Sequence, residues 1–102
     1  MSVPKHLRER GRVLFEQVSG EFELEPHALE LLRLASEALD RTEQARQALA
    51  DEGILTVTSQ GRRVAHPAVS IERDGRLAVA RLLREIGLDE PLPDSRPPRR
   101  RH

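Results

Sequence analysis

One stretch decides the fold: residues 26–52 read PHALELLRLASEALDRTEQARQALADE. Proline suits the first position of a helix because it has no N–H to donate there, and glycine suits the position just after a helix. Pro26 and Gly53 therefore bound a predicted helix over residues 26–52. At about 1.5 Å per residue this helix would be roughly 40 Å long.

The first half of this helix is apolar around more than half of its circumference. Its apolar residues are Ala28, Leu29, Leu31, Leu32, Leu34, Ala35, Ala38 and Leu39. Such an arc is too wide for a single partner helix. We therefore expect the first half to contact two neighbours and the second half, which narrows to Ala45, Ala48 and Leu49, to contact one or none. Part of the arc is a candidate interface between copies of the chain, formed by Leu29, Leu31, Leu32, Leu34 and Leu39.

On the N-terminal side, residues 4–19 are predicted to form a first helix with Pro4 at its start. One narrow face carries the apolar or small residues Leu7, Gly11, Leu14, Phe15 and Val18. The cations Lys5, Arg8 and Arg12 lie towards the opposite side. In residues 20–25, Phe22 and Leu24 alternate with glutamates, which fits either a short extended piece or an ordinary loop between helices.

On the C-terminal side of this helix, the sequence pattern changes from one typical of helices to one typical of strands. Residues 54–58 are rich in β-branched side chains, residues 59–62 read as a turn, and residues 63–65 are a candidate return strand. A lone hairpin is marginal in water, so it should pack on helices or on a neighbouring subunit.

Residues 67–87 predict a third helix that starts at Pro67 and ends at Gly87. Its apolar stripe consists of Ala68, Ile71, Ala78, Val79, Leu82, Leu83 and Ile86. The opposite face carries Arg73, Arg81 and Arg84 around Leu77. Gly75 is unexpected inside this helix, where glycine costs about 1 kcal/mol relative to alanine.

Residues 88–102 are rich in proline and arginine, with almost nothing to bury. We predict a disordered tail over residues 90–102, after one helical domain over residues 1–89. The predicted fold class is mainly α: three helices including a long central one, a short β-hairpin before the last helix, and this tail. The arginines of the tail are Arg96, Arg99, Arg100 and Arg101.

Composition limits the core and the chemistry. The chain has 102 residues, two aromatic side chains (both Phe) and no cysteine. The core is therefore thin, so that either the fold is marginal alone or subunits share apolar surface in an oligomer. Without cysteine, disulfides and zinc sites with thiolate ligands are excluded. The sequence contains neither a recognisable signal peptide nor an apolar run of membrane-spanning length, so no membrane association is expected.

The chain has no net charge, but its charges are segregated. Residues 1–12 carry +3, and residues 13–61 carry −7 from ten acids against three arginines. Residues 62–87 carry +3 and residues 88–102 carry +1. Polyanions are bound by several cations on one surface, whereas the acidic middle segment would repel them.

Nothing in the sequence indicates catalysis. The six glycines are dispersed and form no phosphate-binding loop, and the four histidines lack metal-ligand spacing. Ser36 has no evident base near it in the sequence. We therefore expect a protein that is not an enzyme and that carries no cofactor and no metal.

The order of elements resembles a widespread family of phage terminase small subunits. The resemblance covers roughly residues 12–89. It rests on an acidic connector with Phe22, EALDR (residues 37–41), DEGILTVTSQGRRVAHP (residues 51–67) and IERDGRLAVARLLREIGLD (residues 71–89). The hairpin leading into His66-Pro67 and then Ile71-Glu72-Arg73 is the most specific part.

The resemblance implies a non-enzymatic packaging adaptor in the cytoplasm of the bacterial host. Such subunits recognise the start of packaging on viral double-stranded DNA, assemble as ring-shaped homo-oligomers and bring the DNA to a large ATPase and nuclease subunit. The candidate DNA-binding residues are Lys5, Arg8, Arg10, Arg12, Arg62 and Arg63, although each set is equally explained as solvated surface. The four tail arginines could contact the large subunit or serve only as a solubilising end. The alternative function is a small helical protein-interaction or regulatory oligomer that does not bind nucleic acid.

Overall fold

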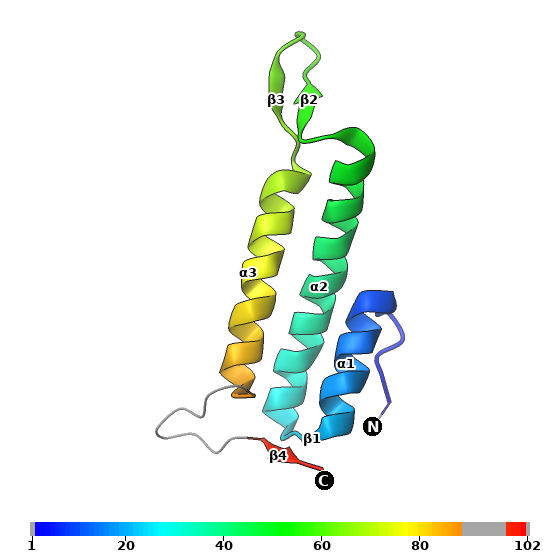
Figure 1. Ribbon diagram of the computed structural model, residues 1–102, viewed down its shortest axis with the longest axis vertical. Coiled ribbons are helices and arrows are strands. Elements are labelled where there is room, and N and C mark those ends of the chain that lie inside the picture. The colour runs from blue at the N-terminus through cyan, green and yellow to red at the C-terminus, as the bar shows by residue number, and fades with distance from the viewer. Residues whose placement is uncertain (1, 89–97, 102) are drawn as a thin grey trace.

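The computed structural model describes residues 2–88 and 98–101 of the chain. The fold is mainly α, as predicted, with a long central helix and a hairpin before the last helix (Figure 1). Its elements are α1 (Glu9–Glu21), β1 (Phe22–Glu23), α2 (Pro26–Glu52), β2 (Leu55–Val57), β3 (Arg63–Ala65), α3 (Ala68–Ile86) and β4 (Arg99–Arg100).

Helix α2 lies between the other two helices and has the predicted bounds. Helix α3 runs along its length, whereas α1 lies beside only the half that begins at Pro26 (Figure 1). Two different helices therefore cover the wide apolar arc of the first half, and the second half faces α3 alone. This confirms the expected division of α2 into a half with two neighbours and a half with one.

The large apolar side chains gather at the end of the molecule where all three helices overlap. This core consists of Leu7, Phe15, Val18, Phe22, Ala28, Leu32 and Ile86. Towards the hairpin, the buried residues on α2 and α3 are small, and they include Thr42, Ala45 and Ala68. The molecule therefore has three helices around a core of large apolar side chains at one end. At the other end it has two helices that bury mainly small residues.

Two helical glycines permit the close packing of the helices. A Cβ atom on Gly75 of α3 would overlap the hydroxyl of Thr42 on α2. A Cβ atom on Gly11 of α1 would overlap the carboxylate of Asp40 and lie 2.5 Å from the carbonyl oxygen of Ser36. The glycine that seemed unfavourable inside the third helix is thus the residue that lets α3 approach α2.

The predicted first helix is correct in place but wrong at its start. Residues 4–19 were expected to be helical from Pro4, whereas α1 begins at Glu9 and continues to Glu21. Pro4 instead accepts a hydrogen bond from the N–H of Leu7 at 3.3 Å, in a turn that precedes the helix. The helix starts later because its first N–H groups are bonded by a side chain of α2, as described below.

Strands β2 and β3 form the predicted hairpin, which is antiparallel. Its register pairs Leu55 with Ala65, Thr56 with Val64 and Val57 with Arg63. The hairpin projects beyond the ends of α2 and α3 rather than lying on the helices (Figure 1). Packing of the hairpin on helices, one of the two expectations for it, is therefore not observed among the described residues.

The C-terminal residues depart from the prediction of a tail without structure. Strand β4 pairs antiparallel with β1, so that Arg100 lies opposite Phe22 and Arg99 opposite Glu23. The prediction of disorder for residues 90–102 is thus wrong for Arg99 and Arg100. Residues 89–97 and 102 lie outside the described residues, and Arg96 is among them.

The molecule is long and thin. Its extents are 56 × 31 × 18 Å and its radius of gyration is 16.8 Å. A compact domain of this length has a radius of gyration of about 13 Å. Within the described residues, no helix is both long and apolar enough to cross a lipid bilayer.

Candidate functional surfaces

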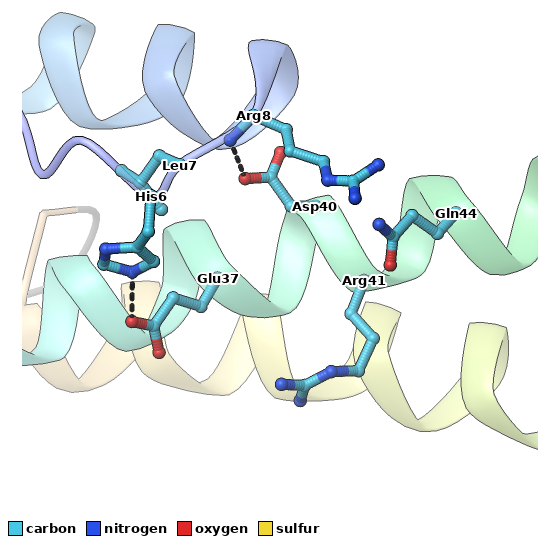
Figure 2. Close-up of a pocket in the computed structure, with 7 residues that line it drawn as sticks. All are labelled: His6, Leu7, Arg8, Glu37, Asp40, Arg41 and Gln44. Carbon is cyan, nitrogen blue, oxygen red and sulfur yellow. Dashed lines mark hydrogen bonds and ion pairs between the residues drawn. The ribbon is translucent and has the colours of Figure 1, made fainter.

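The start of α1, which carries the N-terminal cations, is bonded to a buried carboxylate of α2. Asp40 accepts a hydrogen bond from the backbone N–H of Arg8 at 2.6 Å (Figure 2) and another from that of Gly11 at 2.7 Å. The first N–H groups of a helix have no partner within the helix and need an acceptor from elsewhere. Asp40 supplies that acceptor for α1. It thus does what the side chain of the N-cap residue, just before a helix, usually does. Its position thus fixes where α1 begins.

A second contact holds the segment before α1. His6 Nε2 lies 2.6 Å from Glu37 Oε2, and the same carboxylate accepts a hydrogen bond from Arg33 at 2.7 Å. Burial alone would raise the pKa of Glu37, but the hydrogen bonds from His6 and Arg33 outweigh it and lower that pKa. Glu37 is therefore an anion that ties the N-terminal segment to the middle of α2.

The candidate DNA-binding residues at the N-terminus are all exposed, but they are not equivalent. With the Gln44 amide turned so that its oxygen faces Arg8, that oxygen accepts hydrogen bonds from the Arg8 guanidinium at 2.8 to 3.1 Å. Within the described residues, no carboxylate oxygen lies within 4.0 Å of the side-chain nitrogens of Lys5, Arg10 or Arg12. Arg8 thus has a structural role, whereas the other three are available for an external anion.

Carboxylates lie near these cations. A groove between the start of α1 and α2 is lined by Arg8, Glu9, Arg10, Asp40, Glu43, Gln44 and Gln47. A neighbouring pocket is lined by His6, Leu7, Arg8, Glu37, Asp40, Arg41 and Gln44 (Figure 2). A phosphate group inside either cavity would meet acids as well as arginines. An anion should therefore contact the outward tips of Lys5, Arg10 and Arg12 rather than enter a cavity.

The hairpin carries both remaining DNA candidates and an apolar face. Arg62 and Arg63 are exposed, as expected for residues at a turn. Ile54, Leu55 and Val57 are 66%, 52% and 63% exposed. Leu55 and Val57 point to the same side of the hairpin as their cross-strand partners Ala65 and Arg63, because alternate residues of a strand share a face. One face of the hairpin is therefore an uncovered apolar surface with an arginine at its edge.

The proposed interface leucines of α2 have different environments. Leu32 is completely buried inside the chain, so the prediction that it contacts another copy is wrong. Leu29 and Leu31 are half-buried and pack against the core, and Leu39 is also half-buried. Leu34 alone of the five is exposed, at 42%. The arc was wide because two helices of the same chain cover it, which sequence periodicity cannot distinguish from contact with another chain.

The outward face of α3 carries a further basic group that the sequence had singled out. A groove there is lined by Asp74, Leu77, Ala78, Arg81 and Arg84. Leu77 is 59% exposed, and Arg73 pairs with Asp74 at 3.4 Å. The arginines of this face are thus accompanied by a carboxylate and an exposed leucine.

The C-terminal arginines contact the end of α1. Arg100 forms an ion pair with Glu21 at 2.8 Å, and its guanidinium carbon lies 5.4 Å from the centre of the Phe22 ring. Arg101 donates its backbone N–H to the carbonyl oxygen of Glu21 and its Nε–H to that of Ser19, both at 2.7 Å. Sequence periodicity could not reveal this contact, because it joins residues about eighty positions apart.

In the described part of the chain, no group of three or more His, Cys, Asp or Glu residues is placed to hold a metal ion. Comparison of the whole chain with protein-family models, with curated proteins and with solved structures found no match.

Proposed function

We propose that this chain is a self-assembling adaptor of the terminase small-subunit kind. It binds viral double-stranded DNA at the packaging start, and it recruits or regulates a large ATPase and nuclease subunit. The proposal begins from the sequence resemblance, which is most specific over the hairpin at residues 51–67. The observation that carries it further is the uncovered apolar face of that hairpin, formed by Leu55 and Val57 beside Ile54.

The hairpin supports self-assembly because its exposed face is unfavourable in water. A two-stranded hairpin is marginally stable without further packing. Burial of apolar surface contributes about 25 cal/mol per Å², so covering these side chains by a second copy would stabilise hairpin and assembly together. In the proposed assembly, this face meets a different surface on the neighbouring copy. Such a contact repeats from copy to copy, and it closes into a ring where the rotation allows.

The cations support DNA binding through multiplicity. Within the described residues, one subunit offers only Lys5, Arg10 and Arg12 as N-terminal cations without an ion pair or a structural contact like that of Arg8, which is few for a polyanion. An oligomer repeats this set around its circumference, and weak contacts then act together. Arginine and lysine contacts to phosphates position a protein on duplex DNA without reading its sequence.

Light scattering of the purified protein tests assembly. We expect a multiple of the 11.5 kDa subunit mass at micromolar concentration. The double substitution Leu55→Ser and Val57→Ser should shift the mass towards the monomer while leaving the helical content unchanged. Leu77→Ser, at an equally exposed leucine on α3, is the control and should keep the wild-type mass. A well-folded wild-type monomer would refute the assembly.

Filter binding of a duplex over a salt series tests the DNA contact on the same samples. Replacing Lys5, Arg10 and Arg12 with Gln should flatten the salt dependence, by about 0.9 in the logarithmic slope per lost phosphate contact on each subunit. The matched control replaces Arg73, Arg81 and Arg84 with Gln, which removes the same charge from α3. If the wild-type protein binds no duplex at low salt, the alternative of an interaction module without nucleic acid replaces this proposal.

A further inference from the structure

The contact between β4 and the end of α1 is assembled almost wholly from arginines. Helix α1 ends with carbonyl oxygens that have no partner within the helix. The N–H of Phe22 donates a hydrogen bond to the carbonyl oxygen of Val18. Arg101 donates hydrogen bonds to the carbonyl oxygens of Ser19 and Glu21. A cation also suits this end because the helix dipole is negative there. The C-terminal arginines thus act as the cap of α1.

Acidic and aromatic groups complete this contact. Arg100 lies between the Glu21 carboxylate and the Phe22 ring, and Arg99 lies opposite Glu23 in the register of the two strands. The ion pair is exposed, with 68% of the Arg100 side chain and 48% of the Glu21 side chain accessible. Exposed pairs contribute about 1 kcal/mol or less each and weaken with salt. The ion pair is therefore weak enough for a competing anion to displace it.

We propose that this contact is an electrostatic latch that competes with a polyanion for the same arginines. In the latched state, Arg99 and Arg100 pair with the acidic strand β1, and Arg101 bonds to the carbonyl oxygens at the end of α1. The phosphates of a DNA duplex offer these guanidinium groups charge-assisted acceptors, which are stronger than the carbonyl oxygen that Arg101 contacts and comparable to the carboxylate that Arg100 contacts. Binding of duplex to these arginines releases β4 from β1, and closing the latch lowers the affinity for duplex. The polyanion role rests on the proposed DNA-binding function, whereas the latch itself does not.

A cross-link tests whether the latch exists. The chain has no cysteine, so an introduced pair supplies its only thiols. Glu23→Cys with Arg99→Cys places the thiols at directly opposite positions of the two strands, where Cα atoms are about 4.5 to 5.5 Å apart and a disulfide can form. Glu25→Cys with Arg99→Cys is the out-of-register control. The first pair should form a disulfide within one chain much faster than the second, and equal rates would refute the latch.

The same cross-linked protein tests the competition. Affinity for a short duplex of random sequence is measured on the oxidised and reduced forms of the in-register pair, which differ only in the disulfide. Because binding requires the open state, the reduced form should bind about two- to fivefold more tightly. Equal affinity of the two forms would overturn the competition while leaving the latch in place. Failure of unmodified protein to bind any duplex would instead refute the proposed function and the polyanion role together.

A pair of charge substitutions separates the latch from a general effect of charge. Glu21→Gln removes the carboxylate that contacts Arg100, and Glu25→Gln removes the same charge two residues beyond β1. The latch predicts a larger gain in duplex affinity for Glu21→Gln than for Glu25→Gln. Equal gains would show that the acidic segment acts only through its summed charge and would overturn the proposal.

Discussion

Two helical glycines determine how closely the helices of this chain pack. Glycine inside a helix is unfavourable by about 1 kcal/mol relative to alanine, and both Gly11 and Gly75 have this cost. Each also faces an atom of α2 that a Cβ would overlap: the Asp40 carboxylate for Gly11 and the Thr42 hydroxyl for Gly75. The local cost is therefore offset by packing that exists only once the helices have met.

We predict that Gly75→Ala destabilises the protein by about 1 to 3 kcal/mol, the usual cost of overfilling a packed contact. The opposing atom belongs to Thr42, which is 2% exposed and bonded to the carbonyl of Ala38, so it has little room to move. Gly20→Ala is the control, because a Cβ there meets nothing within 4 Å, and it should be neutral or stabilising. Denaturant unfolding measures both changes.

Removal of the opposing hydroxyl should relieve the Gly75→Ala variant. In a double-mutant cycle, the combination of Thr42→Ala and Gly75→Ala should be more stable than the sum of the two single changes predicts. Strict additivity would show that the two residues do not oppose each other across the helix contact.

At the scale of the elements, helix boundaries that depend on neighbouring residues in the sequence were predictable. A boundary that depends on a contact with a residue far away in the sequence was not. Pro26, Gly53 and Gly87 mark ends that the sequence alone determines, and the structure places them there. The start of α1 was misplaced because its cap, Asp40, lies 32 residues from Arg8. A signal did exist, since Asp40 shares a helical face with Leu29 and Ser36, where a carboxylate is out of place unless it has a partner.

We predict that Asp40→Ala destabilises the protein by about 1 to 3 kcal/mol, because it leaves the N–H groups of Arg8 and Gly11 without their acceptor. Glu43→Ala, one turn further along α2 and more exposed, should change stability by no more than about 0.5 kcal/mol. Thermal unfolding compares the two variants. Equal melting temperatures would mean that Asp40 does not hold the start of α1.

The candidate surfaces were predictable only in part. The exposed arginines at residues 62 and 63 follow from a turn, which the sequence signals through Gly61. The environment of the five leucines could not be predicted, because the same apolar arc fits contacts within one chain or between two. The contacts of Arg100 and Arg101 with the end of α1 form only when folding brings distant residues together, so no local sequence pattern predicts them.

At the scale of the whole molecule, stability should be uneven. The large core side chains lie where α1 overlaps α2, whereas the end near the hairpin buries mainly small residues such as Ala45 and Ala68. Regions with few buried apolar contacts open at lower free energy than the core. One end of the chain therefore has a packed core of large side chains, and the other end buries little apolar surface of its own.

Hydrogen exchange measures this difference. In dilute protein we expect fast exchange of the amides in residues 54–65 and in the first turns of α3, and slow exchange in residues 28–36 of α2. Raising the protein concentration should slow exchange at the hairpin while leaving residues 28–36 unchanged. Uniformly slow exchange in a dilute monomer would contradict both the uneven stability and the role of the hairpin in assembly.

The hairpin joins the helices through two short connections with different surroundings. On one side, His66 accepts a hydrogen bond from the N–H of Ala68 and lies 3.2 Å from Glu52, which ties the return strand to both helices. On the other side, Gly53 has a positive φ of 83° and nothing within 4 Å of a Cβ position. The Gly53 connection is therefore surrounded by open space, whereas two side-chain contacts of His66 hold the other connection. In the assembly that we propose, the angle between neighbouring copies would depend on the angle of the hairpin, so substitution of Gly53 would change the number of subunits that closes a ring.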